Sequence, residues 1–152
     1  MFQQLFTSLY QALLGTPAPS SLIPVYQKSI FPGVGLSTFF AVALGMALVY
    51  YVVLNRLMTT ALFKTSHWLL FVLLTALASA VLAYSQAHSV VTESLNSSGV
   101  ALEGIEQSAY NRYVLGFLCV NALFGALFFV FWSFVVKSFS TSARTTPVRW
   151  PN

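Results

Sequence analysis

The sequence predicts an all-α integral membrane protein with three transmembrane helices and a short N-terminal amphipathic helix, the third transmembrane helix extending beyond the membrane. Two observations carry this prediction. The 152-residue chain is 57% hydrophobic and 7% charged, whereas a soluble domain has roughly 25% charged residues. The apolar residues also form three long runs separated by short polar segments, as expected for helices that are solvated by lipid. We treat residues 1–152 as a single membrane domain.

Residues 1–15 have the pattern of a short amphipathic helix. The apolar residues Phe2, Leu5, Phe6, Leu9 and Leu13 recur at helical spacing, and glutamine, serine and threonine occupy the opposite face. The polar face carries no Lys or Arg, so attraction to anionic lipid is not what holds this helix at a surface. Two roles remain open: contact with the lipid interface or a vestibule, and packing against the chain's own spans or a neighbouring subunit. Because no positively charged region precedes the apolar stretch, we expect the segment to be retained rather than removed as a secretory signal.

Residues 16–35 contain four prolines and are expected to form an extended linker. Three spans follow, at residues 36–54, 68–84 and 113–136, and none contains a charged residue. The second span is at the short end of the usual range. The third is long enough to require a tilt or an extension of its helix beyond the membrane.

Residues 85–112 are predicted to be an outer loop whose second half is helical. The apolar period there runs without a breaker into the third span, so we expect one helix from about residue 99 to 137. Ser97 or Ser98 could cap its start. Asn96 begins a glycosylation triplet, which is informative only in a secretory-pathway protein.

The basic residues indicate the orientation. Five of the seven lie in the first loop or in the basic tail, residues 137–152, and two lie on the other side of the spans, at Lys28 and Arg112. Because cytoplasmic flanks carry the excess of Lys and Arg, this favours an outside N-terminus and a cytoplasmic C-terminus. The bacterial inner membrane fits slightly better than an organelle membrane.

The residue inventory argues against catalysis. The three spans contain no ionisable side chain that could carry protons or ions. His67 and His88 lie 21 residues apart, about 31 Å along a helix, and cannot share one metal within a subunit. Glu103 and Glu106 provide fewer ligands than a calcium site needs. The scattered basic residues form no patch for nucleic acid. We therefore expect no enzyme activity, no cofactor, no metal and no nucleic-acid partner.

The spans do contain small and hydroxyl residues at helix-packing intervals, which permit close approach between helices in lipid. The candidate packing or pore-lining residues are Ser37, Ala41, Gly45, Thr75, Ser79, Asn121 and Gly125. Asn121 is the only strongly polar side chain deep in a span, and burying it without a partner would cost a few kcal/mol. It is therefore expected to bond another helix or to face water in a pore.

Three helices make a thin bundle, and its packing faces indicate partners besides the lipid bilayer. The first functional hypothesis is a non-catalytic structural or anchoring subunit, either in a homo-oligomer or with other membrane subunits. The alternative is a homo-oligomeric channel whose path runs along a subunit seam, lined by Asn121 and hydroxyl groups. A lipid- or cofactor-binding enzyme is a weaker third hypothesis.

Overall fold

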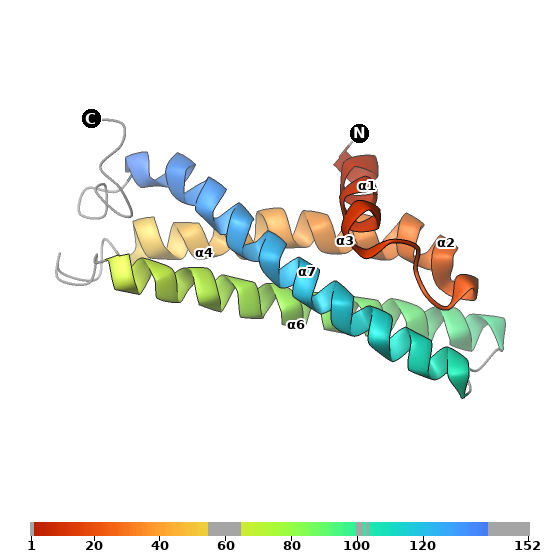
Figure 1. Ribbon diagram of the computed structural model, residues 1–152. Coiled ribbons are helices and arrows are strands. Elements are labelled where there is room, and N and C mark those ends of the chain that lie inside the picture. Colours follow the sequence, from red (N-terminus) through yellow and green to blue (C-terminus); the bar gives the residue numbers. More distant parts are fainter. Residues whose placement is uncertain (1, 55–64, 100–101, 103, 140–152) are drawn as a thin grey trace.

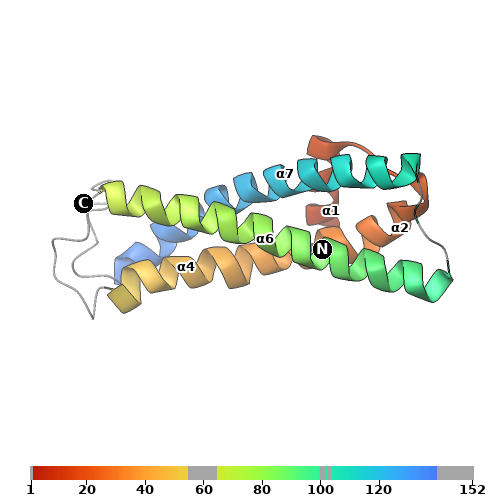
Figure 2. The same cartoon turned by 90° about the horizontal axis from the view of Figure 1, so that it is seen from below.

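The fold is an all-helical bundle, as predicted. The computed structural model describes residues 2–54, 65–99, 102 and 104–139, and every regular element in these ranges is a helix. Three long helices, each long and apolar enough to cross a membrane, run side by side (Figures 1 and 2): Ser20–Val53, α6 (Thr65–Ser98) and α7 (Ile105–Val136). The chain is therefore an integral membrane protein in contact with lipid.

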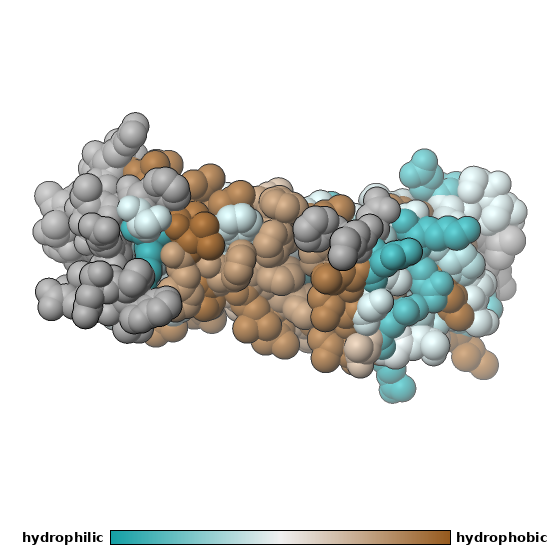
Figure 3. Space-filling view, turned by 90° about the horizontal axis from the view of Figure 1, so that it is seen from above, coloured by the Kyte–Doolittle hydropathy of each residue, from teal (hydrophilic) through white to brown (hydrophobic). Residues whose placement is uncertain are grey.

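The long helices extend well beyond the predicted spans. The first and second each have 34 residues and α7 has 32, which corresponds to about 50 Å each, against roughly 30 Å of hydrocarbon in a bilayer. Figure 3 shows a hydrophobic band over one part of the bundle and hydrophilic residues at the end that carries α2. We call residues 20–29, 85–98 and 105–112 the polar end. The bundle thus projects from one side of the membrane.

The expected extended linker over residues 16–35 is mostly helical. Only residues 15–19 are irregular, and the first long helix starts at Ser20. Its inward face carries Leu22, Tyr26, Ile30 and Val34 at helical spacing, all buried. This burial outweighs the helix-breaking tendency of the prolines. The helix runs without interruption through these elements: η1 (Ser20–Leu22), α2 (Ile23–Val25), π-helical η2 (Tyr26–Ile30), α3 (Phe31–Leu36), π-helical η3 (Ser37–Leu44), α4 (Gly45–Leu48) and π-helical η4 (Val49–Val53).

Pro32 is accommodated by a local widening of this helix. It follows directly on the π-helical turn η2, in which the Phe31 amide donates to the carbonyl of Tyr26, five residues earlier. Continued by one residue, that pattern would pair the Gln27 carbonyl with residue 32, and proline has no N–H to donate. The sequence therefore leaves the Gln27 carbonyl without its π-helical donor.

The prediction of an outer loop over residues 85–112 is wrong for the first half of this segment, which is helical. Helix α6 continues to Ser98, because Ala83, Ala87 and Val91 extend its buried face at helical spacing. Helix α7 starts at Ile105 rather than near residue 99, with Gly104 at a φ of 53° before it. The prediction that Ser97 or Ser98 caps the start of α7 is also wrong, because both hydroxyls donate back to carbonyls within α6. Helix α7 ends at Val136, as predicted.

Helix α1 (Phe2–Leu14) runs across the long axis of the bundle rather than along it, in both views of the ribbon (Figures 1 and 2). It ends at Gly15, whose φ of 73° suits glycine, and whose amide bonds the Gln11 carbonyl. The predicted amphipathic helix over residues 1–15 is thus present. Of the predicted tail, residues 137–152, only η6 (Lys137–Phe139) belongs to the described part, and the first loop, residues 55–64, lies outside it.

We expect the polar extension of α6 to be a stable helix. Backbone amides of Ala87 and Val91 should exchange with solvent much more slowly than the amide of Gly99, because the former lie on a buried helical face. Hydrogen exchange read by mass spectrometry or NMR in lipid nanodiscs measures this. Equally fast exchange at all three positions would contradict the helical extension.

Candidate functional site

The side chain of Asn121 on α7 is polar and completely buried inside the bundle. Its amide nitrogen donates to the Ser79 carbonyl of α6 at 2.6 Å and to the Thr38 hydroxyl at 3.0 Å. Its amide oxygen accepts from the hydroxyl of Tyr10 and lies 3.2 Å from that of Thr38. One side chain thus bonds α1, the first long helix and α6. We call Tyr10, Thr38, Ser79 and Asn121 the polar centre.

Gly125 allows α7 to come close enough for this arrangement. It lies one helical turn after Asn121, and a Cβ atom built on it would overlap the hydroxyl of Ser79 and lie 3.1 Å from the carbonyl of Thr75. A larger residue would push the two helices apart. The glycine therefore brings the Asn121 amide within reach of the Ser79 carbonyl.

The hydroxyls that were candidates for a wettable lining are bonded within α6. Thr75 donates to the carbonyl of Phe71 at 2.6 Å, and Ser79 donates to that of Thr75 at 2.7 Å. Both side chains are fully buried. Their polar atoms are satisfied by their own helix, as hydroxyls in apolar helices commonly are.

The remaining predicted residues lie apart from the polar centre. Ser37 accepts a hydrogen bond from the amide of Gln86 at 3.3 Å. Ala41 is exposed, and no other helix comes within 4 Å of the place where a Cβ of Gly45 would be. The structure therefore brings together Asn121, Gly125, Thr75 and Ser79, and leaves the Ala41 and Gly45 face open.

Tyr10 is the main component that sequence reasoning missed. Its ring is fully buried and packs against Phe31, Phe117 and Phe124 at centroid distances of 5.1–5.2 Å. Burial raises the pKa of its hydroxyl above the ordinary value, and this hydroxyl donates to the amide oxygen of Asn121. The sequence feature that could have identified Tyr10 is its position four residues after Phe6, on the apolar side of α1. Thr38, likewise, stood inside an apolar run as a possible partner for an amide.

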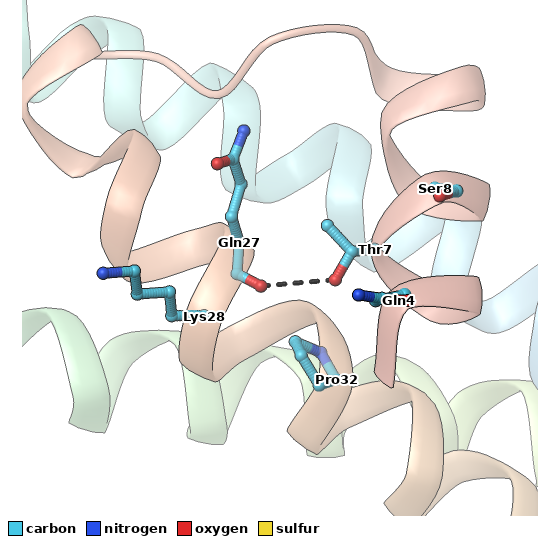
Figure 4. Close-up of a pocket in the computed structure, with 6 residues that line it drawn as sticks. All are labelled: Gln4, Thr7, Ser8, Gln27, Lys28 and Pro32. Atoms are coloured by element: carbon cyan, nitrogen blue, oxygen red, sulfur yellow. Dashed lines mark hydrogen bonds between the residues drawn. The ribbon is translucent and has the colours of Figure 1, made fainter. Parts of the chain in front are cut away.

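Two further contacts fix α1 at this place. Phe6 lies on Gly35, where even a Cβ would approach the Phe6 Cβ to 2.9 Å, so the two helices touch almost backbone to backbone. The Thr7 hydroxyl donates to the Gln27 carbonyl at 3.2 Å, beside Pro32 (Figure 4). Thr7 thus supplies the donor that Pro32 lacks. Sequence reasoning left the partner of this helix open, and the structure packs it on the chain's own spans.

The chemistry available at the polar centre is hydrogen bonding alone. It contains hydroxyls, one amide and a backbone carbonyl, and no group that ionises near neutral pH. Over the described ranges, no group of three or more His, Cys, Asp or Glu side chains could hold a metal. Cys119 is exposed on α7. The arrangement links α1, the first long helix, α6 and α7 through hydrogen bonds.

In comparisons with known proteins, no family model matches the chain, and neither does any curated protein or solved structure.

Replacing Asn121 with leucine should destabilise the bundle by about 1–3 kcal/mol, because the Tyr10 and Thr38 hydroxyls lose a buried partner. Thermal or denaturant unfolding in detergent measures the change. Asn111→Leu is a matched control, since Asn111 is exposed at the polar end and bonds only Gln107 in the described part of the chain. Equal stability of the two variants would mean that the polar centre does not hold the helices together.

Proposed function

We propose that this chain is a non-catalytic subunit of an oligomeric membrane assembly, with a structural or anchoring role. The observation that carries the proposal is the open small-residue face of the first long helix. Ala41 is exposed, and no atom beyond the neighbouring turns of its own helix lies within 4 Å of the position that a Cβ on Gly45 would take, whereas the space beside Gly35 and Gly125 is filled by other helices of the chain. A lipid chain gains little from such a face, but another helix can approach it closely.

The polar centre supports a scaffold more than a pore. The Asn121 amide is bonded on both its nitrogen and its oxygen, and the hydroxyls of Thr75 and Ser79 are bonded along α6. A water path through these groups would have to break the contacts that join the helices. The channel alternative therefore needs a path elsewhere, along a seam between subunits.

Over the described residues, α6 and α7 present large apolar side chains on the surface of the hydrophobic band. On α6 these include Leu73, Leu77 and Val81, and on α7 they include Leu123 and Leu127. Side chains of this kind suit lipid or an apolar partner helix, whereas ion paths use carbonyls, charged rings or wettable walls. This favours assembly over conduction.

Substituting Gly45 with leucine tests the assembly proposal. The larger side chain should weaken self-association or partner binding by roughly 1–3 kcal/mol through overpacking of the interface. The stability of the single chain should be little changed, since no other helix of the bundle comes within 4 Å of a Cβ at this position. The mass of the protein in detergent or nanodiscs gives the readout, and ion flux in liposomes is measured on the same samples.

Leu127→Ala, at an exposed position of α7, is the control for a surface change in the membrane. A monomeric wild type, or a Gly45→Leu variant of unchanged mass, would contradict the proposal. Ion flux through wild-type oligomers of preserved mass would favour the channel instead.

We also propose that the polar end faces outward and that the end bearing Thr65 and Lys137 faces the cytoplasm, with the bacterial inner membrane as the location. The excess of Lys and Arg on the Lys137 side supports this orientation. Lys28 and Arg112 are the basic residues of the polar end.

Cysteine labelling in intact cells tests the orientation. In a Cys119→Ala background, Ser97→Cys should react with a membrane-impermeant maleimide, and Thr65→Cys should react only after permeabilisation. Both positions are exposed ends of α6, so neither substitution disturbs packing. The reverse pattern would invert the orientation while leaving the three spans intact.

A further inference from the structure

We infer that α1 lies in the plane of the membrane at the headgroup boundary and that its exposed leucine face contacts the acyl chains of membrane phospholipids. This surface is independent of the assembly proposal. The inference rests on the faces of α1, its direction and its level along the bundle.

Helix α1 has three faces. Phe6, Tyr10 and Leu14 point toward the bundle. Leu5, Leu9 and Leu13, four residues apart, form a second stripe that is 37–56% exposed. Gln4, Thr7, Ser8 and Gln11 form the third face on the other side. Packing on the chain's own spans does not explain the leucine stripe, because these leucines point away from the bundle. In water the exposed leucines would cost free energy.

The level of α1 matches the boundary of the hydrophobic band. Figure 1 places α1 beside the part of the bundle where the surface in Figure 3 changes from hydrophobic to hydrophilic. Helix α1 also runs across the bundle axis, so its whole length stays at this level. Amphipathic helices that lie on a membrane adopt this position, at the border of headgroups and acyl chains.

The polar face of α1 points toward the polar end of the bundle, and its leucine stripe points toward the hydrophobic band. Its polar face lines a groove of about 370 Å³ together with Gln27, Lys28 and Pro32, which lie toward the polar end (Figure 4). The leucine stripe is on the other side of the helix and therefore points toward the hydrophobic band. The groove then opens among the headgroups, where the exposed ammonium of Lys28 supplies the positive charge that α1 itself lacks.

Collision accessibility of spin labels tests this inference in phospholipid vesicles. In a Cys119→Ala background, labels are placed singly at Leu5→Cys, Leu13→Cys and Ser8→Cys. Oxygen concentrates among acyl chains and a neutral nickel chelate stays in water. We therefore expect oxygen to dominate relaxation at positions 5 and 13, and nickel to dominate at position 8. All three positions are exposed, so the labels leave the contacts of Phe6 and Tyr10 intact.

Two further spin labels serve as references for the accessibility to oxygen and to the nickel chelate. Leu73→Cys, 62% exposed in the apolar part of α6, is the lipid reference, and Ser97→Cys at the polar end is the water reference. Positions 5 and 13 should resemble position 73 but lie at shallower depth. Nickel-dominated relaxation at positions 5 and 13 would overturn the inference by showing that water covers the leucine stripe. Protection from both reagents would overturn it in favour of a protein partner, such as a second copy of this chain.

Discussion

A buried amide in a membrane helix must find hydrogen-bond partners inside the protein, because the acyl chains around it offer none. Asn121 imposes this requirement on the whole bundle. Its bond to the Ser79 carbonyl requires α6 and α7 to be close, which Gly125 permits. Its contacts with Thr38 and Tyr10 then set the rotation of the first long helix and the depth to which α1 inserts.

A backbone carbonyl imposes a second requirement of the same kind. Pro32 removes the donor that the π-helical turn would direct to the Gln27 carbonyl, and Thr7 of α1 supplies a hydroxyl in its place. One short helix thus satisfies a side chain deep in the bundle and a backbone group near its edge. This double role accounts for the close contact of Phe6 with Gly35, which leaves no room for a larger residue.

Much of the architecture could be predicted from the sequence, because hydropathy alone locates charge-free runs long enough for a bilayer. The cost of Asn121 in lipid predicted that its amide would bond another helix or face water, and the span that carries it was located correctly. Its partner Tyr10 could not be identified, since the two residues are 111 positions apart and belong to segments without a shared pattern. The errors have local causes. Prolines suggested an extended linker because the helix-breaking rule assumes α-helical bonding, and abundant serines obscured the buried face of Ala87 and Val91.

The hydrogen bond from Tyr10 to Asn121 also determines an order of events in biosynthesis. Helix α1 leaves the ribosome before α7, and α7 carries Asn121, the residue that completes the binding site of α1. Until α7 inserts, α1 has no place to bury Tyr10, and the aromatic pocket of Phe117 and Phe124 does not exist. Helix α1 can therefore dock completely only after α7 has been synthesised. It thus takes its final position after a helix that follows it in the chain.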